Sequence, residues 1–119
     1  MKTKTWAIAI TILCTLFTSL GQIFFKWGSE NIAFSLQGLI LNTPLIIGLM
    51  VYGIGAVLYL LALRHGELSV IAPLIATSYI WVSIISPYFF PSDVMNPIKW
   101  VGVATIFLGV SLIGYGGRL

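Results

Sequence analysis

Residues 15–30 read TLFTSLGQIFFKWGSE, an apolar stretch interrupted by polar side chains at regular intervals. Five polar residues, four of them in this stretch and one shortly before it, are spaced 4, 3, 4 and 4 positions apart: Thr11, Thr15, Thr18, Gln22 and Lys26. At about 100° per residue they share one face of a helix, within about 80° of each other. A membrane-spanning helix with this polar stripe is expected to turn it toward protein or a watery cavity rather than lipid.

The composition indicates that a lipid bilayer surrounds this chain. Of its 119 residues 59% are hydrophobic and only 8% are charged, whereas a soluble domain carries about 25% charged residues. Too few polar side chains are present to cover a water-soluble core. We therefore predict an all-α fold, an integral membrane bundle of helices.

Four apolar runs have the length of about 20 residues that a spanning helix needs. They lie at about 5–26, 44–63, 69–90 and 97–116, and we expect them to form a single four-helix transmembrane domain over residues 1–119. The shorter apolar run at 32–41 cannot span and predicts a brief helix at the interface. No small-x-small cleavage site follows the first run, so we expect that helix to be retained.

The basic residues predict the orientation in the membrane. Four spans place both termini on one side, and the basic residues divide four to two between the sides: Lys2, Lys4, Arg64 and Arg118 against Lys26 and Lys99. This excess favours cytoplasmic termini in a multi-pass protein of the cell membrane, plasma or inner. Because no basic stripe interleaved with aromatic residues is present, nucleic acid is not an expected partner.

The few titratable residues argue against catalysis, metal binding and proton-coupled cation export. The three carboxylates, Glu30, Glu67 and Asp93, fall in or beside connections, whereas a proton-coupled exporter of cations usually needs a carboxylate inside a span. With one His and one Cys, the chain offers no metal-ligand cluster and no catalytic constellation. We expect no enzymatic activity, no cofactor and no metal.

The stripe on the first helix has two interpretations. Threonine and glutamine commonly join helices in membranes, and a lysine near the end of a span can extend to the headgroups. Alternatively, Gln22 and Lys26, one turn apart, line a polar cavity and meet an anionic group.

Two other helices carry residues that suit either packing or binding. In the second, Gly48, Tyr52, Gly55 and Tyr59 share a face, where they could pack on a neighbour or form an aromatic wall for a sugar or an amine. In the third, Pro73 precedes Thr77 and Trp81 and can bend or hinge the helix. In the last helix, Gly102 and Gly109 lie two turns apart and suit close contact with another helix, in the same chain or in a second copy.

These residues support a family resemblance. The chain resembles the four-helix branch of the drug/metabolite transporter superfamily, which holds the small multidrug resistance proteins and the short EamA-like proteins. The resemblance is carried by SLGQIFFKWGSE (19–30), YGIGAVLYLLALRHGELSVIAPL (52–74), SYIWV (78–82) and WVGVATIFLGVSLIGYG (100–116). Within this branch, Gly21-Gln22 with Lys26, and Pro73 with Trp81, are most similar to subunits implicated in flipping aminoarabinose linked to a polyprenyl phosphate.

The resemblance also implies an assembly of two chains, and at one position this sequence differs from the family's pattern. Gly102 and Gly109 are similar to the last-helix dimer motif of the small multidrug exporters, which implies a homodimer or a pair of small subunits. Those exporters carry an essential glutamate in the first helix, and the matching position here is Thr18. This difference, like the position of all three carboxylates in or beside connections, argues against proton-coupled multidrug export.

The resulting hypothesis is a transporter of a polar or anionic amphiphile, such as a lipid-linked sugar. The candidate substrate-binding residues come from three helices: Thr18, Gln22, Lys26, Tyr52, Tyr59, Thr77 and Trp81. Two alternatives stay open. One is an exporter of a small soluble metabolite or cation, and the other is a non-transporting subunit of a larger membrane complex.

Overall fold

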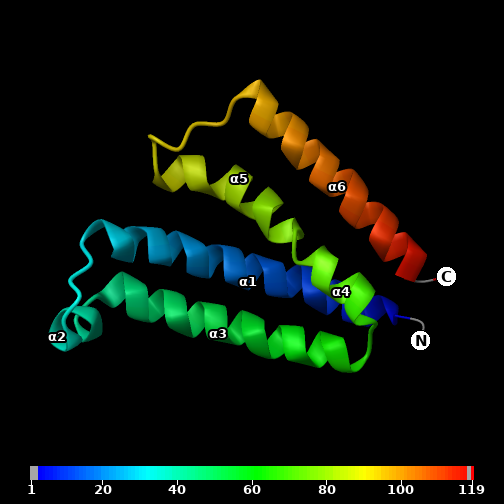
Figure 1. The fold of residues 1–119 in the computed structure, drawn as a ribbon, viewed down its shortest axis with the longest axis horizontal. Coiled ribbons are helices and arrows are strands. Elements are labelled where there is room, and N and C mark those ends of the chain that lie inside the picture. Colours follow the sequence, from blue (N-terminus) through cyan, green and yellow to red (C-terminus); the bar gives the residue numbers. More distant parts are fainter. Residues whose placement is uncertain (1–2, 118) are drawn as a thin grey trace.

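The computed structural model describes residues 3–117 and 119, and it is helical without a strand among them. The helices are α1 (Thr5–Glu30), α2 (Leu36–Ile40), α3 (Thr43–Arg64), α4 (Leu68–Leu74), α5 (Thr77–Phe89) and α6 (Pro97–Gly117), as Figure 1 shows. Four segments are long and apolar enough to cross a membrane: α1, α3, α4 together with α5, and α6. The predicted all-α fold with four spanning segments is confirmed.

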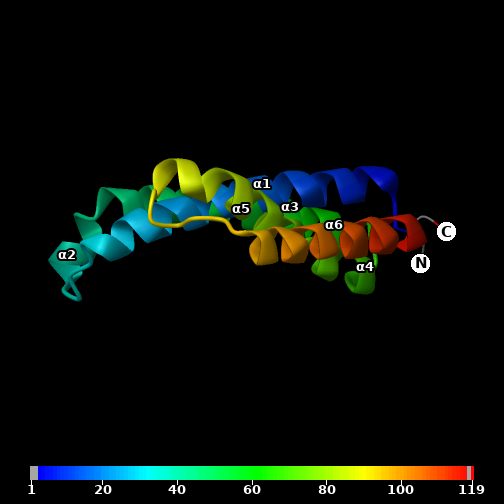
Figure 2. The ribbon, with the colours of Figure 1, turned by 90° about the horizontal axis from the view of Figure 1, so that it is seen from above.

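The four spanning segments lie side by side in the order α3, α1, α4–α5 and α6 (Figure 1). The molecule measures 50 × 36 × 18 Å along its principal axes, so this row is a flat layer, as the view from above shows (Figure 2). α1 lies inside the row between α3 and α4–α5. α6 lies at the edge, packs mainly on α4 and α5, and none of its residues is buried.

Side-chain hydrogen bonds cap the first turns of α2 and α3. The Asn42 side-chain oxygen accepts a hydrogen bond from the Leu45 N–H, and Pro44 occupies the first turn of α3, where its missing N–H is no loss. The Asn42 amide also donates to the Gly28 carbonyl at 2.9 Å, which ties α3 to the end of α1. The short helix expected within 32–41 is α2, capped by the Ser35 hydroxyl.

The third span differs from the continuous helix expected at about 69–90, because it is two helices. After Pro73 the backbone tightens, and the Ile75 and Ala76 N–H groups donate to carbonyls only three residues earlier, at 3.1 and 3.0 Å. A proline within a helix removes one donor and displaces the preceding turn. The bend predicted at Pro73 is therefore a break between α4 and α5.

Glycines let α1 and α3 pack closely along their length. A Cβ built on Gly48 of α3 would lie 3.0 Å from the Gly21 carbonyl oxygen of α1 and 2.9 Å from Phe25 Cδ1. A Cβ on Gly55 would lie 2.8 Å from the Thr18 methyl group. Gly48 and Gly55, grouped with two tyrosines in the sequence, thus serve helix packing.

Both ends of the chain meet at one end of the layer, which we call the termini end (Figure 1). The Thr3 N–H donates to the Gly117 carbonyl at 3.0 Å, and the Glu67 N–H donates to the Thr3 hydroxyl at 3.1 Å. The main buried apolar cluster lies nearby and comprises Ala7, Ala62, Val70, Ile71 and Leu74. The opposite end, which holds α2 and the connection between α5 and α6, is called the loop end.

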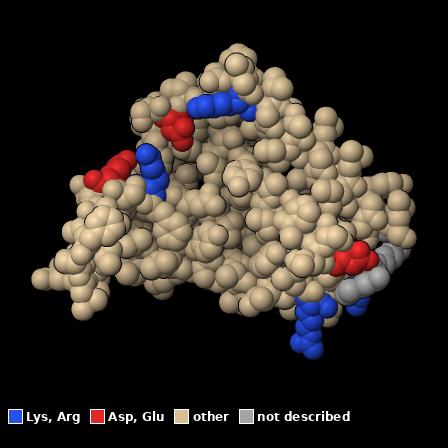
Figure 3. Space-filling view, in the orientation of Figure 1, with Lys and Arg blue, Asp and Glu red and all other residues tan. Residues whose placement is uncertain are grey.

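The charged side chains visible in Figure 3 lie along the rim of the layer, and the central area of this face shows none. Lys4, Arg64 and Glu67 belong to the termini end, and Lys26, Glu30, Asp93 and Lys99 to the loop end. The predicted orientation also used Lys2 and Arg118, which lie outside the described residues. An uncharged middle is what the hydrocarbon core of a bilayer requires.

Candidate functional site

The polar stripe of α1 divides into a buried part and an exposed part. Thr11, Thr15 and Thr18 are buried, and each hydroxyl donates to a backbone carbonyl three or four residues earlier in α1, at 2.8, 2.6 and 3.1 Å. Gln22 and Lys26 are exposed. The threonines therefore satisfy their hydrogen bonds inside the protein, while the amide and the ammonium stay open to the surroundings.

Hydrogen bonds join the buried part of the stripe to the third span. The Trp81 indole N–H donates to the Thr15 hydroxyl at 3.0 Å. The single Ser19 hydroxyl proton lies between two carbonyl oxygens, that of Thr15 in α1 at 2.6 Å and that of Ser78 in α5 at 3.1 Å. The sequence analysis did not predict these contacts between α1 and α5. Spacing within one helix identifies a polar face but not the neighbour that meets it.

A small hollow of about 300 Å³ between α1, α3 and α4 brings three of the candidate residues together. Thr18, Tyr52 and Tyr59 line it with small apolar neighbours: Cys14, Ala56, Ala72 and Ile75. Two tyrosine rings beside a threonine are chemically suited to a sugar or an amine. Of the α1 residues predicted to bind substrate, Thr18 lines this hollow with the two tyrosines, and Gln22 and Lys26 do not.

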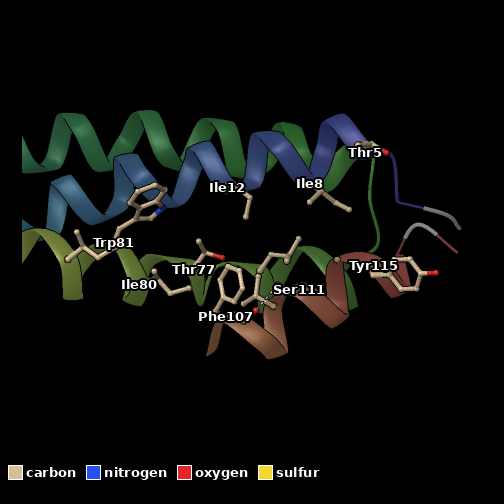
Figure 4. A pocket seen from close by; sticks show the side chains of 13 residues that line it. Thr5, Ile8, Ile12, Thr77, Ile80, Trp81, Phe107, Ser111 and Tyr115 are labelled. Atoms are coloured by element: carbon tan, nitrogen blue, oxygen red, sulfur yellow. Dashed lines mark hydrogen bonds between the residues drawn. The ribbon is translucent and has the colours of Figure 1, made fainter. Parts of the chain in front are cut away.

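A larger groove of about 610 Å³ lies between α1, α4–α5 and α6 (Figure 4). Thr77 and Trp81 line it with the following side chains and one glycine: Thr5, Ile8, Ile12, Leu74, Ile80, Ile84, Phe107, Val110, Ser111, Gly114 and Tyr115. In Figure 4, Ile8 and Ile12 of α1 face Phe107 and Ser111 of α6 across it. No lining residue is charged, and α6 contributes residues that the sequence analysis did not select.

Lys26 lies away from both hollows, near the loop end of α1. Its Nζ is 5.9 Å from the centroid of the Phe90 ring, and it forms no ion pair within the described part of the chain. The adjacent Trp27 packs edge-on against Phe89 and Phe90, with ring centroids 5.3 and 5.6 Å apart. The result is an exposed ammonium beside an aromatic cluster that includes Phe24.

Two other charged groups of the loop end, Asp93 and Lys99, form local hydrogen bonds. The Ser86 hydroxyl donates to the Asp93 carboxylate, which fixes the start of the connection to α6. The Lys99 ammonium donates to the Val94 carbonyl at 2.8 Å. Lys26 and Lys99 therefore differ, because only the Lys99 ammonium has a hydrogen-bond acceptor in the described chain.

The two glycines expected at a subunit interface lie on open surface. A Cβ built on Gly102 or on Gly109 would meet nothing within 4 Å. Neither glycine contributes to the packing of α6 on α4 and α5 described above.

The comparisons with known proteins point to membrane transport. The chain is 30% identical over 112 residues to the uncharacterized protein y4nH of Sinorhizobium fredii, covering 92% of this chain and 96% of that protein. It is 30% identical over 109 residues, 89% of this chain and 95% of the relative, to a protein of Pectobacterium atrosepticum. That protein is named probable 4-amino-4-deoxy-L-arabinose-phosphoundecaprenol flippase subunit ArnE.

A third relative has a different substrate in its name. The probable magnesium transporter NIPA9 of Arabidopsis thaliana is 28% identical over 118 residues, which are 94% of this chain and 34% of that protein. No family model and no solved structure matches the chain. The named relatives are thus transporters or flippase subunits, and none of these names describes an enzyme.

Proposed function

The chain belongs to the drug/metabolite transporter superfamily, in the four-helix branch that includes ArnE-type subunits, and on this premise we propose that it moves an anionic amphiphile across the bilayer. The class we favour is a sugar linked through phosphate to a long apolar chain. Such a molecule can keep its chain in lipid while its headgroup crosses. The proposed location is the cell membrane, with cytoplasmic termini.

The observation that carries this proposal is the exposed Lys26 ammonium. Lys26 lies four residues before the end of α1 at Glu30, about 6 Å along the helix axis, which places its backbone at the edge of the hydrocarbon core when α1 spans the bilayer. From there a lysine side chain can extend to the lipid phosphates. Without an ion pair in the described chain, its charge is available to a phosphate group. Gln22, one turn deeper and also exposed, adds an amide that can donate to the same headgroup.

Two chains would give the headgroup an enclosed path. The single chain is a flat layer, and neither Gln22 nor Lys26 lines the hollow that Thr18 forms with the α3 tyrosines. A second copy or a paired small subunit packed on the layer would bring these groups to one interior, with Gly102 and Gly109 at the contact.

The test is a transport assay on the assembly purified in mild detergent and reconstituted in sealed vesicles. The probe is a radiolabelled, water-soluble short-chain isoprenyl phosphosugar, which reaches the lumen only by transport. Lys26→Ala and Lys26→Glu should lower the initial rate about tenfold or more, because a hydrogen bond to a charged group contributes about 1.5–3 kcal/mol. Lys26→Arg should keep most of the rate.

The matched control is Lys99→Ala, which removes the other loop-end lysine. Because the Lys99 ammonium is bound to the Val94 carbonyl, we expect this variant to transport at the wild-type rate. Equal rates for wild type, Lys26→Ala and Lys26→Glu would refute the assignment of Lys26 to the headgroup.

A second candidate function is transport of a small cation, which the similarity to a named magnesium transporter favours. In that case uptake of the metal ion alone, measured in the same vesicles, should respond to an imposed ion gradient. A rate of isoprenyl phosphosugar uptake equal to that of empty vesicles, together with gradient-driven cation uptake, would favour this second function.

A further inference from the structure

The groove between α1, α4–α5 and α6 has the size and chemistry of a small-molecule site. Its volume of about 610 Å³ falls within the range of about 300–1,000 Å³ typical of ligand pockets, which are mostly apolar with a few polar groups that orient the ligand. Its lining is uncharged and mainly aliphatic and aromatic. The site therefore suits an uncharged hydrophobic molecule.

Thr77 is the buried polar group in this groove that lacks a hydrogen-bond partner. It is only 8% exposed, and its Oγ1 is the one buried side-chain nitrogen or oxygen without a hydrogen bond among the described residues. Eight other helical hydroxyls donate to a carbonyl three or four residues earlier: those of Thr11, Thr15, Thr18, Ser19, Ser29, Ser83, Thr105 and Ser111. An unpaired buried hydroxyl is unfavourable and indicates an absent partner.

The break in the third span explains why Thr77 differs. Thr77 is the first residue of α5 and follows the tightened turn in which the Pro73 carbonyl accepts the Ala76 N–H at 3.0 Å, so the turn before it is not a regular α-helical turn. Threonine in a helix has two accessible χ1 states. Rotation between them moves Oγ1 from one staggered position to another and lets it turn to a molecule in the groove.

Two other polar groups of the lining, on Trp81 and Ser111, are already hydrogen-bonded. The Trp81 N–H donates to the Thr15 hydroxyl, so the indole forms an apolar side of the groove. The Ser111 hydroxyl, on the facing side in Figure 4, donates to the Phe107 carbonyl. Thr77 is thus the group positioned to orient a ligand by a hydrogen bond deep in the groove.

The depth of Thr77 narrows the ligand class. Thr77 follows Leu68, the start of the α4–α5 span, by nine residues, or about 14 Å along the helix, close to the middle of a core about 30 Å thick. The esters of ordinary phospholipids lie at the interface and do not reach it.

We propose that this groove binds an uncharged hydrocarbon chain carrying a hydrogen-bonding oxygen within the chain, with Thr77 donating to that oxygen. The site lies between the termini end and the middle of the layer, whereas Lys26 lies near the loop end. The inference therefore stands apart from the proposed transport of a phosphate headgroup.

The test uses two photoactivatable probes of equal length in vesicles that contain the assembled protein. One is a long-chain ether with its oxygen in mid-chain, and the other is the alkane with a methylene in its place. In the wild type, the ether should label peptides of α5 and α6 that line the groove several-fold more than the alkane does. Thr77→Ser should keep this preference, and Thr77→Val should reduce the ratio to about one.

The matched control is Thr105→Val on α6. Its hydroxyl donates to the Val101 carbonyl and does not line the groove, so the ether preference should be unchanged. Equal labelling by both probes in the wild type, labelling confined to surfaces outside the groove, or an unchanged ratio in Thr77→Val would each overturn the proposal. Because this readout is binding, its failure would leave the Lys26 transport test unaffected.

Discussion

The hydroxyl groups of the spanning helices differ in their hydrogen-bond partners. Most donate to their own helix, Thr15 also accepts the Trp81 indole N–H, and Thr77 has no partner. Sequence spacing predicted that the α1 hydroxyls share a face. It could not predict which of them would be covered, because that depends on the partner helix and its tilt.

The Thr15–Trp81 hydrogen bond should stabilise the contact between α1 and α5. Thr15→Val leaves the partly buried indole N–H without its acceptor, so we expect a loss of about 1 kcal/mol in the free energy of unfolding. Thr77→Val removes no hydrogen bond and should leave stability equal or higher. Thermal unfolding in mild detergent measures both.

A double-mutant cycle isolates the bond itself. Trp81→Phe removes the indole N–H, so adding Thr15→Val to it should cost less than Thr15→Val costs alone. Strictly additive losses from the two substitutions would show that the contact contributes nothing to stability.

At the level of elements, the close α1–α3 pair contrasts with the interrupted third span. Glycine spacing in α3 was compatible with either packing or an aromatic binding face, and the structure uses the glycines for packing on α1. Pro73 predicted a bend, but the separation into α4 and α5 depends on the tightened turn after it. A proline in the sequence predicts where a helix is disturbed, but it does not predict whether the helix bends there or ends.

Gly48→Ala should weaken the α1–α3 contact. The new Cβ would lie 3.0 Å from the Gly21 carbonyl oxygen, a backbone atom that cannot move without shifting the helix. Overpacking of this kind costs about 1–3 kcal/mol, which would lower the thermal midpoint in detergent.

Gly53→Ala is the matched control on the same helix, because its Cβ would meet nothing within 4 Å. We expect its midpoint to equal or slightly exceed that of the wild type, since alanine is the better helix former. If Gly48→Ala and Gly53→Ala unfolded at the same temperature, the close α1–α3 packing would be wrong.

At the level of the whole molecule, the four spans form a layer with an open edge. α6 has 21 residues and none is buried. The number of spans and their apolar character followed from the sequence, because run length and composition determine them. The flat arrangement did not, because hydrophobicity on all sides of a helix does not distinguish contact with lipid from contact with protein.

Gly109→Ile tests whether the open side of α6 carries the assembly contact. A Cβ there meets nothing within the chain, so the fold should persist while a close helix–helix contact with another chain is blocked. Native mass spectrometry in mild detergent should show wild-type dimers, or pairs with another small subunit, and monomers of the variant.

Ala104→Ile adds similar bulk to α6 on a different face, and we expect it to leave the assembly intact. Assemblies of equal mass for wild type and Gly109→Ile would place the contact between chains elsewhere on the layer.

The hydrogen bond between Thr3 and Gly117 has a consequence for gene duplication. Because the start and the end of the chain emerge side by side, a short linker can join two copies head to tail. Each copy crosses the membrane four times, so the two halves of the fused chain would face the same way. A fused pair in opposite orientations would need one additional crossing between the halves.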